Sequence, residues 1–364
     1  MTAGTTERSD RPWGMVVGLS LVTIAAAAYE IAPASVTPVL MERLSVGPTG
    51  AGWIVSIMLG VAVVASIPVG IGLDRTDPRV VTAGGAVLLV LSGLWGWQAA
   101  ADGAYRWLLV SRVFGAIGYT VVWNASAHLI GLGFDLDARA TAIGVFTASG
   151  TAGFALGQVA GPPIVAVFGP AAIFGAFGII AVIGLGVFWP TSVGVMDGLD
   201  DDATRAPDLA AFRRVLTSRT VWHVCAMGFM GYSLFLFINS WMPTYLTERL
   251  GVSLAGGGLI VGGFAAIGIL ARTGGGVLSD RVFERRRRPV AIISFLVATP
   301  LVVGLALVDV VAVVIVLLIA AGFFVQLGIA LFYTMVREVV DPAVAATAVS
   351  VMTSISLFGG FSAP

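Results

Sequence analysis

Three ionisable residues interrupt long apolar stretches of this sequence: Glu30, Arg112 and Arg272. A carboxyl group in such a place can take up and release a proton, and an arginine can bind a carboxylate through paired hydrogen bonds. Charged groups are costly inside a bilayer, so each of the three is a candidate functional residue. The plainer interpretation is a structural ion pair between Glu30 and Arg112 that joins two helices.

Neutral polar residues inside the apolar stretches are weaker candidates. Each can line a solute cavity or form a hydrogen bond between helices, which is worth about 0.6–2 kcal/mol. The candidates are Asn124, Gln158, Tyr232, Asn239, Gln326 and Tyr333. We favour Gln158, Asn239 and Gln326 as cavity residues. His128 and His223 lie near the ends of apolar stretches, where an interfacial role is the simpler interpretation.

The composition places the chain in a membrane. Hydrophobic residues make up 58% of the 364 residues, charged residues 11%, and the mean hydropathy is +0.98. A soluble domain with so little charge would expose one large apolar surface. The net charge of zero argues against a nucleic-acid partner. Because no metal-ligand spacing or phosphate-binding loop is present, we expect no metal, no cofactor and no enzymatic activity.

Ten apolar segments are long enough to span a bilayer, where each must be helical to pair its backbone groups. The expected spans are 13–40, 51–73, 80–101, 105–131, 139–168, 171–189, 221–246, 255–278, 289–308 and 310–336. An eleventh segment begins near Ala343 and reaches Pro364, the last residue of the sequence. The polar stretch 190–220 is expected to be a solvated linker.

Arginine is distributed unevenly between the loops on the two sides. All 20 basic residues are arginines, and only Arg43, Arg106 and Arg249 fall in loops on the side opposite the N-terminus. Cytoplasmic loops carry an excess of basic residues. We therefore expect a multi-pass protein of the cell membrane with a cytoplasmic N-terminus.

Position along the segments then predicts the depth of each ionisable residue. At 1.5 Å per residue, Glu30 is about 25 Å from the inner start of its segment, and Arg112 is about 10 Å from the outer start of its own. Both therefore fall in the outer half of a core about 30 Å thick. Arg272 lies in the cytoplasmic third. We favour extension of its side chain toward the cytoplasm, or support of the following loop, over solute contact.

A Gly-x-x-x-Asp-Arg motif occurs twice, each time at the end of an apolar segment. Its residues are Gly70, Asp74, Arg75 and the following Arg79 in the first copy, and Gly276, Asp280 and Arg281 in the second. The shift of 206 residues from Asp74 to Asp280 also aligns Gly153 with Gly359. Two separate matches at one shift indicate duplication of a six-helix unit.

Six spans, a linker, a second similar unit and this motif resemble the major facilitator superfamily of transporters. The resemblance covers the whole chain and implies an all-α membrane fold of two six-helix bundles in parallel repeat. It implies a cytoplasmic tail at 1–12, a first bundle at 13–189, a cytoplasmic linker at 190–220 and a second bundle at 221–364. Because a complete member has twelve helices, it also implies truncation within the eleventh.

The repeated motif predicts a cytoplasmic gate. A glycine at a helix end lets another helix approach closely, and an aspartate just beyond it can bind arginine or helix-end N–H groups. Such a cluster can hold two halves together and release them when they tilt. The positive-inside rule explains the arginines alone, but not the repeated spacing. Asp77 stands where the family usually has glycine.

The resemblance implies that the first and fourth spans line a central cavity, which would place Glu30 and Arg112 there and let them meet as a pair. We expect a proton-coupled transporter, monomeric in the lipid bilayer, that moves a small anion or organic acid by alternating access and symport. A drug/proton antiporter is the alternative, suggested by Gly157-x-x-x-Gly161-Pro162, although helix packing explains those glycines too. A non-transporting membrane sensor or an inactive truncated product is the third possibility.

Overall fold

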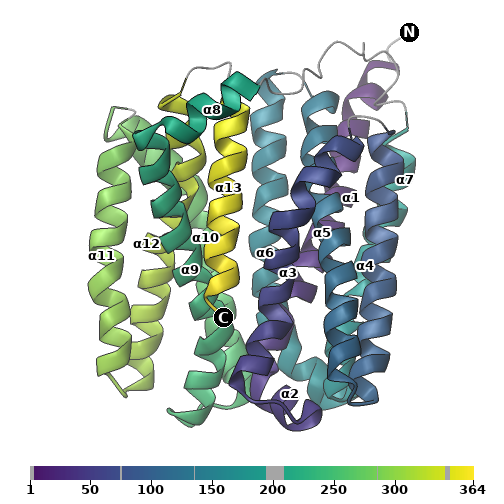
Figure 1. Ribbon diagram of the computed structural model, residues 1–364, viewed down its shortest axis with the longest axis vertical. Coiled ribbons are helices and arrows are strands. Elements are labelled where there is room, and N and C mark those ends of the chain that lie inside the picture. Colours follow the sequence, from purple (N-terminus) through teal and green to yellow (C-terminus); the bar gives the residue numbers. More distant parts are fainter. Residues whose placement is uncertain (1–3, 74–75, 135, 194–208, 285, 341–344) are drawn as a thin grey trace. The chain divides into compact units, whose positions relative to one another are not determined.

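The computed structural model describes residues 4–73, 76–134, 136–193, 209–284, 286–340 and 345–364. The regular structure within these ranges is entirely helical (Figure 1). Ten helical segments in them are long and apolar enough to cross a membrane, and Ala348–Ser362 forms a shorter apolar helix. The predicted all-α membrane fold is confirmed.

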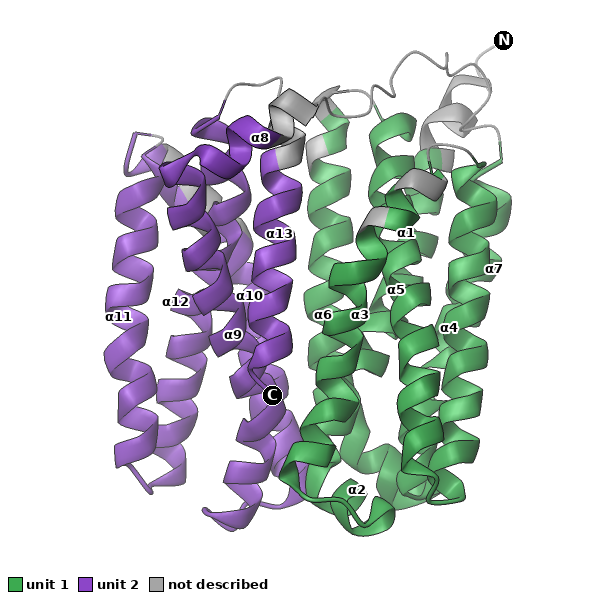
Figure 2. Cartoon of the chain, in the orientation of Figure 1, with its two compact units in different colours: residues 1–204 green, residues 205–364 purple. Residues whose placement is uncertain are grey.

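The chain forms two compact units, coloured separately in Figure 2: unit 1 is residues 1–204 and unit 2 is residues 205–364. The elements of unit 1 are α1 (Gly4–Ile31), η1 (Ala32–Val36), α2 (Thr37–Leu44), α3 (Pro48–Leu73), α4 (Pro78–Ala101), α5 (Tyr105–Gly133), α6 (Leu136–Phe168), η2 (Pro170–Phe174) and α7 (Gly178–Thr191). Those of unit 2 are α8 (Leu209–Thr217), α9 (Arg219–Glu248), α10 (Leu254–Arg281), α11 (Arg287–Leu307), α12 (Val311–Glu338) and α13 (Ala345–Ser362).

Several stretches differ from the expected elements. Helix α1 begins at Gly4, inside the expected tail 1–12, and the expected span 171–189 is divided between η2 and α7. The first expected span, 13–40, is divided among α1, the 3₁₀ helix η1 and α2. Pro33 explains the division, because it has no N–H with which to continue the α-helical hydrogen bonds. The expected linker, 190–220, contains the short helix α8. Ser218 then caps α9, since its Oγ accepts a hydrogen bond from the N–H of Val221 at 3.4 Å.

Glycines bring α6 into close contact with α1. A Cβ added at Gly153 would lie 2.5 Å from the carbonyl oxygen of Ile24, and one added at Gly157 would lie 2.8 Å from that of Ala28. These distances are too short for any side chain, so only glycine permits this approach. The glycine-rich sequence of α6 therefore serves helix packing, as Gly-x-x-x-Gly spacing commonly does in membranes.

The helix pairs of unit 1 recur in unit 2. The pairs α1–α6, α3–α5 and α4–α5 correspond to α9–α13, α10–α12 and α11–α12, and all six pairs are in extensive contact. Gly359 on α13 lies against the carbonyl oxygen of Phe229 as Gly153 lies against that of Ile24. The alignment of Gly153 with Gly359 thus corresponds to the same packing contact in each unit.

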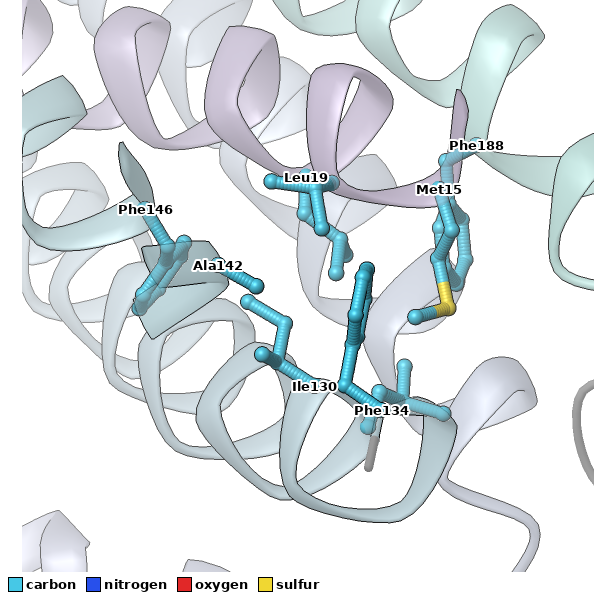
Figure 3. Close-up of a cluster of buried hydrophobic side chains, with 9 residues drawn as sticks. Met15, Leu19, Ile130, Phe134, Ala142, Phe146 and Phe188 are labelled. Carbon is cyan, nitrogen blue, oxygen red and sulfur yellow. The ribbon is translucent and has the colours of Figure 1, made fainter. Parts of the chain in front are cut away.

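A hydrophobic cluster joins four elements at one end of unit 1 (Figure 3). Met15 and Leu19 from α1, Ile130 from α5, Phe146 from α6 and Phe188 from α7 are essentially inaccessible to solvent. Figure 3 shows these side chains directed toward one another between the helices. The cluster fixes α1 at the end opposite to Glu30.

Candidate functional site

Arg112 lies completely buried on α5 and uses every nitrogen of its guanidinium. Nε donates to the carbonyl oxygen of Ile54 at 2.9 Å, Nη1 to that of Tyr29 at 2.7 Å, and Nη2 to that of Glu30 at 2.7 Å. Its Cζ also lies 4.4 Å from the centroid of the Tyr29 ring. Arg112 thereby connects α5 to α1 and α3.

The local sequence at the end of α1 explains why the carbonyls of Tyr29 and Glu30 accept from an arginine. In a continuous α-helix the carbonyl of Tyr29 would bond the N–H of residue 33, but that residue is Pro33. The end of a helix also carries a partial negative charge from its unpaired carbonyls. The charge of Arg112 is therefore balanced by backbone carbonyls and an aromatic face, which favours a cation in its own right.

The carboxyl group of Glu30 is buried but is not paired with Arg112. The residue is 4% exposed, and its Oε1 has no hydrogen-bond partner among the described residues. The two residues that the sequence expected to meet do meet, but through the main-chain carbonyl of Glu30. The Glu30 carboxyl thus keeps its capacity to accept a proton or a hydrogen bond.

The remaining polar candidates are divided between the two units. In unit 1, Gln158 on α6 is fully buried, and Asn124 on α5 is half-buried. In unit 2, Asn239 is buried on α9, and its Nδ2 donates to the carbonyl oxygen of Phe235 at 2.8 Å. That bond lies within one helix.

Gln326 joins two helices of unit 2. It is fully buried on α12, and its Nε2 donates to the carbonyl oxygen of Phe264 on α10 at 2.9 Å. Its amide occupies the place where a Cβ would stand at Gly268. This arrangement ties α12 to α10 and leaves the side chain no exposed surface.

Arg272 on α10 has surroundings unlike those of Arg112. Its Cζ lies 5.8 Å from the centroid of the Phe235 ring on α9, and its buried Nε has no hydrogen-bond partner among the described residues. Nearby, the hydroxyls of Tyr232 and Tyr333 are 3.4 Å apart. The sequence named both tyrosines as polar groups, but it gave no sign that they form a pair.

The predicted gate is only partly covered by the structure. Asp74 and Arg75 lie outside the described residues, as do the surroundings of Gly276 and the side chain of Asp280. A Cβ at Gly70 would meet no described atom within 4 Å, and Arg281 is exposed as the last residue of α10.

Two residues near the first motif have contacts within unit 1. Arg79 joins α4 to α7, because its Nε donates to Oγ of Ser192 at 3.0 Å and its Cζ lies 5.3 Å from the Trp189 ring centroid. Asp77 caps α4 by accepting from the N–H of Arg79 at 2.8 Å. Helix capping therefore accounts for an aspartate where the family usually has glycine.

Comparison with known proteins gives two related sequences, both named as transporters. The hexuronate transporter of Bacillus subtilis (strain 168) is 26% identical over 326 residues, which cover 84% of this chain and 75% of that protein. The probable L-galactonate transporter of Escherichia coli (strain K12) is 26% identical over 245 residues, which cover 61% of this chain and 51% of that protein.

Solved structures show the same fold. Two crystal structures of a bacterial homologue of the human lysosomal transporter Spinster, inward-facing and either unoccupied or occupied, each match with a TM-score of 0.79. They are 19% and 18% identical, covering 97% and 95% of this chain and 80% and 78% of the chains compared. A model of the Major Facilitator Superfamily matches residues 17–364. With its apolar helices and recurring helix pairs, the chain belongs to the Major Facilitator Superfamily.

Proposed function

We propose that this protein is a proton-coupled secondary active transporter of a small organic acid, working by alternating access of two helical units. The two related transporters are each named for a sugar acid. Sugar acids carry a carboxylate, and a chain with arginines inside its apolar helices is suited to that charge. The proposal extends to symport, to a cytoplasmic N-terminus in the cell membrane and to a monomer.

One observation carries the proton-coupling part of the proposal. Oε1 of Glu30 is buried inside an apolar unit without a hydrogen-bond partner among the described residues. Each of the three nitrogens of its neighbour Arg112 already donates to a backbone carbonyl. A carboxyl that is not committed to an ion pair is able to gain and lose a proton during a transport cycle, as ionisable groups inside membranes commonly do.

Reconstitution tests this function directly. Liposomes holding a pH-sensitive dye receive the purified protein, and D-glucuronate or D-galactonate is added outside under an imposed inward proton gradient. We expect solute-dependent acidification of the lumen. Glu30→Gln should abolish it, whereas Glu42→Gln, which changes an exposed glutamate of the same unit, should not. If Glu30→Gln retains uptake with an unaltered response to the gradient, Glu30 is structural.

The same measurement separates the other functions. Protons leaving the lumen as solute enters would indicate exchange, which is the mode of a drug/proton antiporter. No solute-dependent proton movement with any solute would support a non-transporting sensor or an inactive product. The glycines that suggested an exporter pack against α1, so they give that alternative no separate support.

The gate is a further part of the proposed transport cycle. An aspartate that holds the two units together on the cytoplasmic side should favour the outward-open state, so Asp74→Asn should shift the protein toward the inward-open state. Accessibility of single cysteines on the cytoplasmic side to a membrane-impermeant maleimide would measure the shift. Unchanged labelling rates would argue against the gate.

A further inference from the structure

The two arginines inside the apolar helices differ in how many hydrogen-bond donors they have left. All three nitrogens of Arg112 donate to backbone carbonyls. Arg272 contacts the Phe235 ring, and its buried Nε has no partner among the described residues. Because buried N–H groups in proteins are almost always hydrogen-bonded, the Nε of Arg272 is open to an acceptor that the described residues do not supply.

No described carboxylate of unit 2 is available to Arg272. The described acidic residues of this unit lie at helix ends or in loops: Glu248, Glu284, Asp309 and Glu338. Asp309 lies 3.4 Å from Arg249, and Glu338 lies 3.1 Å from Arg287, so two of them have arginine partners of their own. The charge of Arg272 therefore lacks a counter-ion within the described part of the unit, which is costly in an apolar surrounding.

The direction of the Arg272 side chain differs from the expected one. A snorkelling arginine would extend toward the nearer helix end, at Arg281. Arg272 instead places its guanidinium over Phe235, which lies near the middle of α9 (Arg219–Glu248). The guanidinium is thus held near the middle of the unit by an aromatic face.

Two hydroxyl donors lie beside this cation. Tyr232 is one turn before Phe235 on α9, and its hydroxyl is 3.4 Å from that of Tyr333 on α12. The Tyr333 hydroxyl also interacts with Arg272 and with Thr353 of α13. Arg272, Tyr232 and Tyr333 are all half-buried, so each residue keeps some exposed surface. Four helices thus bring one guanidinium and several hydroxyls to one place.

We propose that Arg272 and the hydroxyls of Tyr232 and Tyr333 form a carboxylate-binding subsite of unit 2. A carboxylate would accept paired hydrogen bonds from the guanidinium and further ones from the hydroxyls. This inference rests on the proposed transport of an organic acid, and it assigns the acid group to Arg272 rather than to Arg112.

The test compares D-glucuronate with D-glucuronamide, in which an uncharged amide replaces the carboxylate. Binding to the purified protein is measured by calorimetry. Because hydrogen bonds to charged groups contribute about 1.5–3 kcal/mol, Arg272→Gln should weaken glucuronate binding by about 10- to 100-fold. Its affinity for the amide should stay nearly the same, so the preference for the acid is lost.

Further variants distinguish a loss of binding from a folding defect. Arg272→Lys keeps the charge but loses the paired geometry, so it should fall between wild type and Arg272→Gln. Tyr333→Phe should weaken binding less, because it removes one hydroxyl. Arg249→Gln changes an exposed arginine of the same unit and should leave binding unaltered. If Arg272→Gln does not fold, Arg272→Lys and Tyr333→Phe decide the question by the same preference for acid over amide.

Two negative outcomes are distinguishable. If the wild-type protein binds neither D-glucuronate nor D-galactonate nor D-gluconate, both the organic-acid function and this subsite are overturned. If the wild type binds an acid and the Arg272 and Tyr333 variants retain its affinity and its preference over the amide, only the subsite is overturned.

Discussion

Arg112 and Arg272 are the same residue type in similar apolar helices, yet they differ in how many of their nitrogens are hydrogen-bonded within the protein. Arg112 is fully buried and donates to carbonyls of α1 and α3. Arg272 is half-buried against Phe235, and its Nε has no partner among the described residues. A charged residue inside a membrane is therefore only a candidate site. Whether it can bind a ligand depends on how many of its donors the fold has already used.

The comparison also limits what Arg112 can do in transport. A solute carboxylate would compete for Arg112 with three carbonyl oxygens, and each carbonyl left unpaired in a buried place costs about 1–3 kcal/mol. Arg112 is better suited to hold the end of α1, and thus Glu30, in place. In the proposed transport cycle, Glu30 would carry the proton and Arg272 would bind the anion.

The largest predicted effect separates the two arginines by stability. Arg112→Gln should destabilise the protein by about 3–5 kcal/mol, because it breaks a buried network in which every partner loses its bond. Arg272→Gln should melt close to wild type when no solute is present. Thermal unfolding followed by tryptophan fluorescence in detergent measures both. Equal losses in the two variants would refute the distinction.

The next effect tests whether both units depend on the same close helix contact. Gly153→Ala and Gly359→Ala each place a Cβ against a carbonyl oxygen of the neighbouring helix, so each should cost about 1–3 kcal/mol. Gly144→Ala, on the same helix as Gly153, meets no described atom within 4 Å and should be neutral or stabilise by up to about 1 kcal/mol. If all three variants melt at the same temperature, the close contact of Gly153 and Gly359 with neighbouring helices does not stabilise the units.

A smaller effect concerns the helix end that Arg112 binds. Pro33→Ala restores an N–H that can pair with the carbonyl of Tyr29, which now accepts from Arg112. We expect a loss of about 1 kcal/mol and a reduced cost of Arg112→Gln in the Pro33→Ala background, as coupled residues show in a double-mutant cycle. Pro38→Ala, in the first turn of α2, is the matched control. Strict additivity would mean that Pro33 has no part in creating the acceptor.

The smallest effect concerns an arginine outside the apolar core of unit 2. Arg249 and Asp309 form an ion pair at 3.4 Å, with side chains 63% and 68% exposed. Exposed pairs contribute little because water screens them, so Arg249→Gln should change stability by less than about 0.5 kcal/mol. A larger fall in melting temperature would show that even exposed arginines stabilise this chain. A stability difference between the Arg112 and Arg272 variants would then no longer indicate different roles.

For several candidate residues, the sequence predicts a polar contact but not which atoms make it. Glu30 and Arg112 were expected to meet, and they do, but the sequence does not reveal that a main-chain carbonyl makes the contact. Gln326 was favoured as a cavity residue, yet its amide bonds the carbonyl of Phe264 on another helix. An amide can do either, because the same donor and acceptor groups serve a ligand or a backbone.

The sequence by itself determined the membrane class, the spans, the family and the duplication. Lipid forces every apolar segment to pair its own backbone groups, so hydropathy alone locates the helices. Only the tertiary structure decided which charged side chains are already hydrogen-bonded within the protein. The acceptors of Arg112 lie 58, 82 and 83 residues away along the chain. Hydrogen bonds between helices depend on how the helices pack, and that information is absent from the local pattern around an arginine.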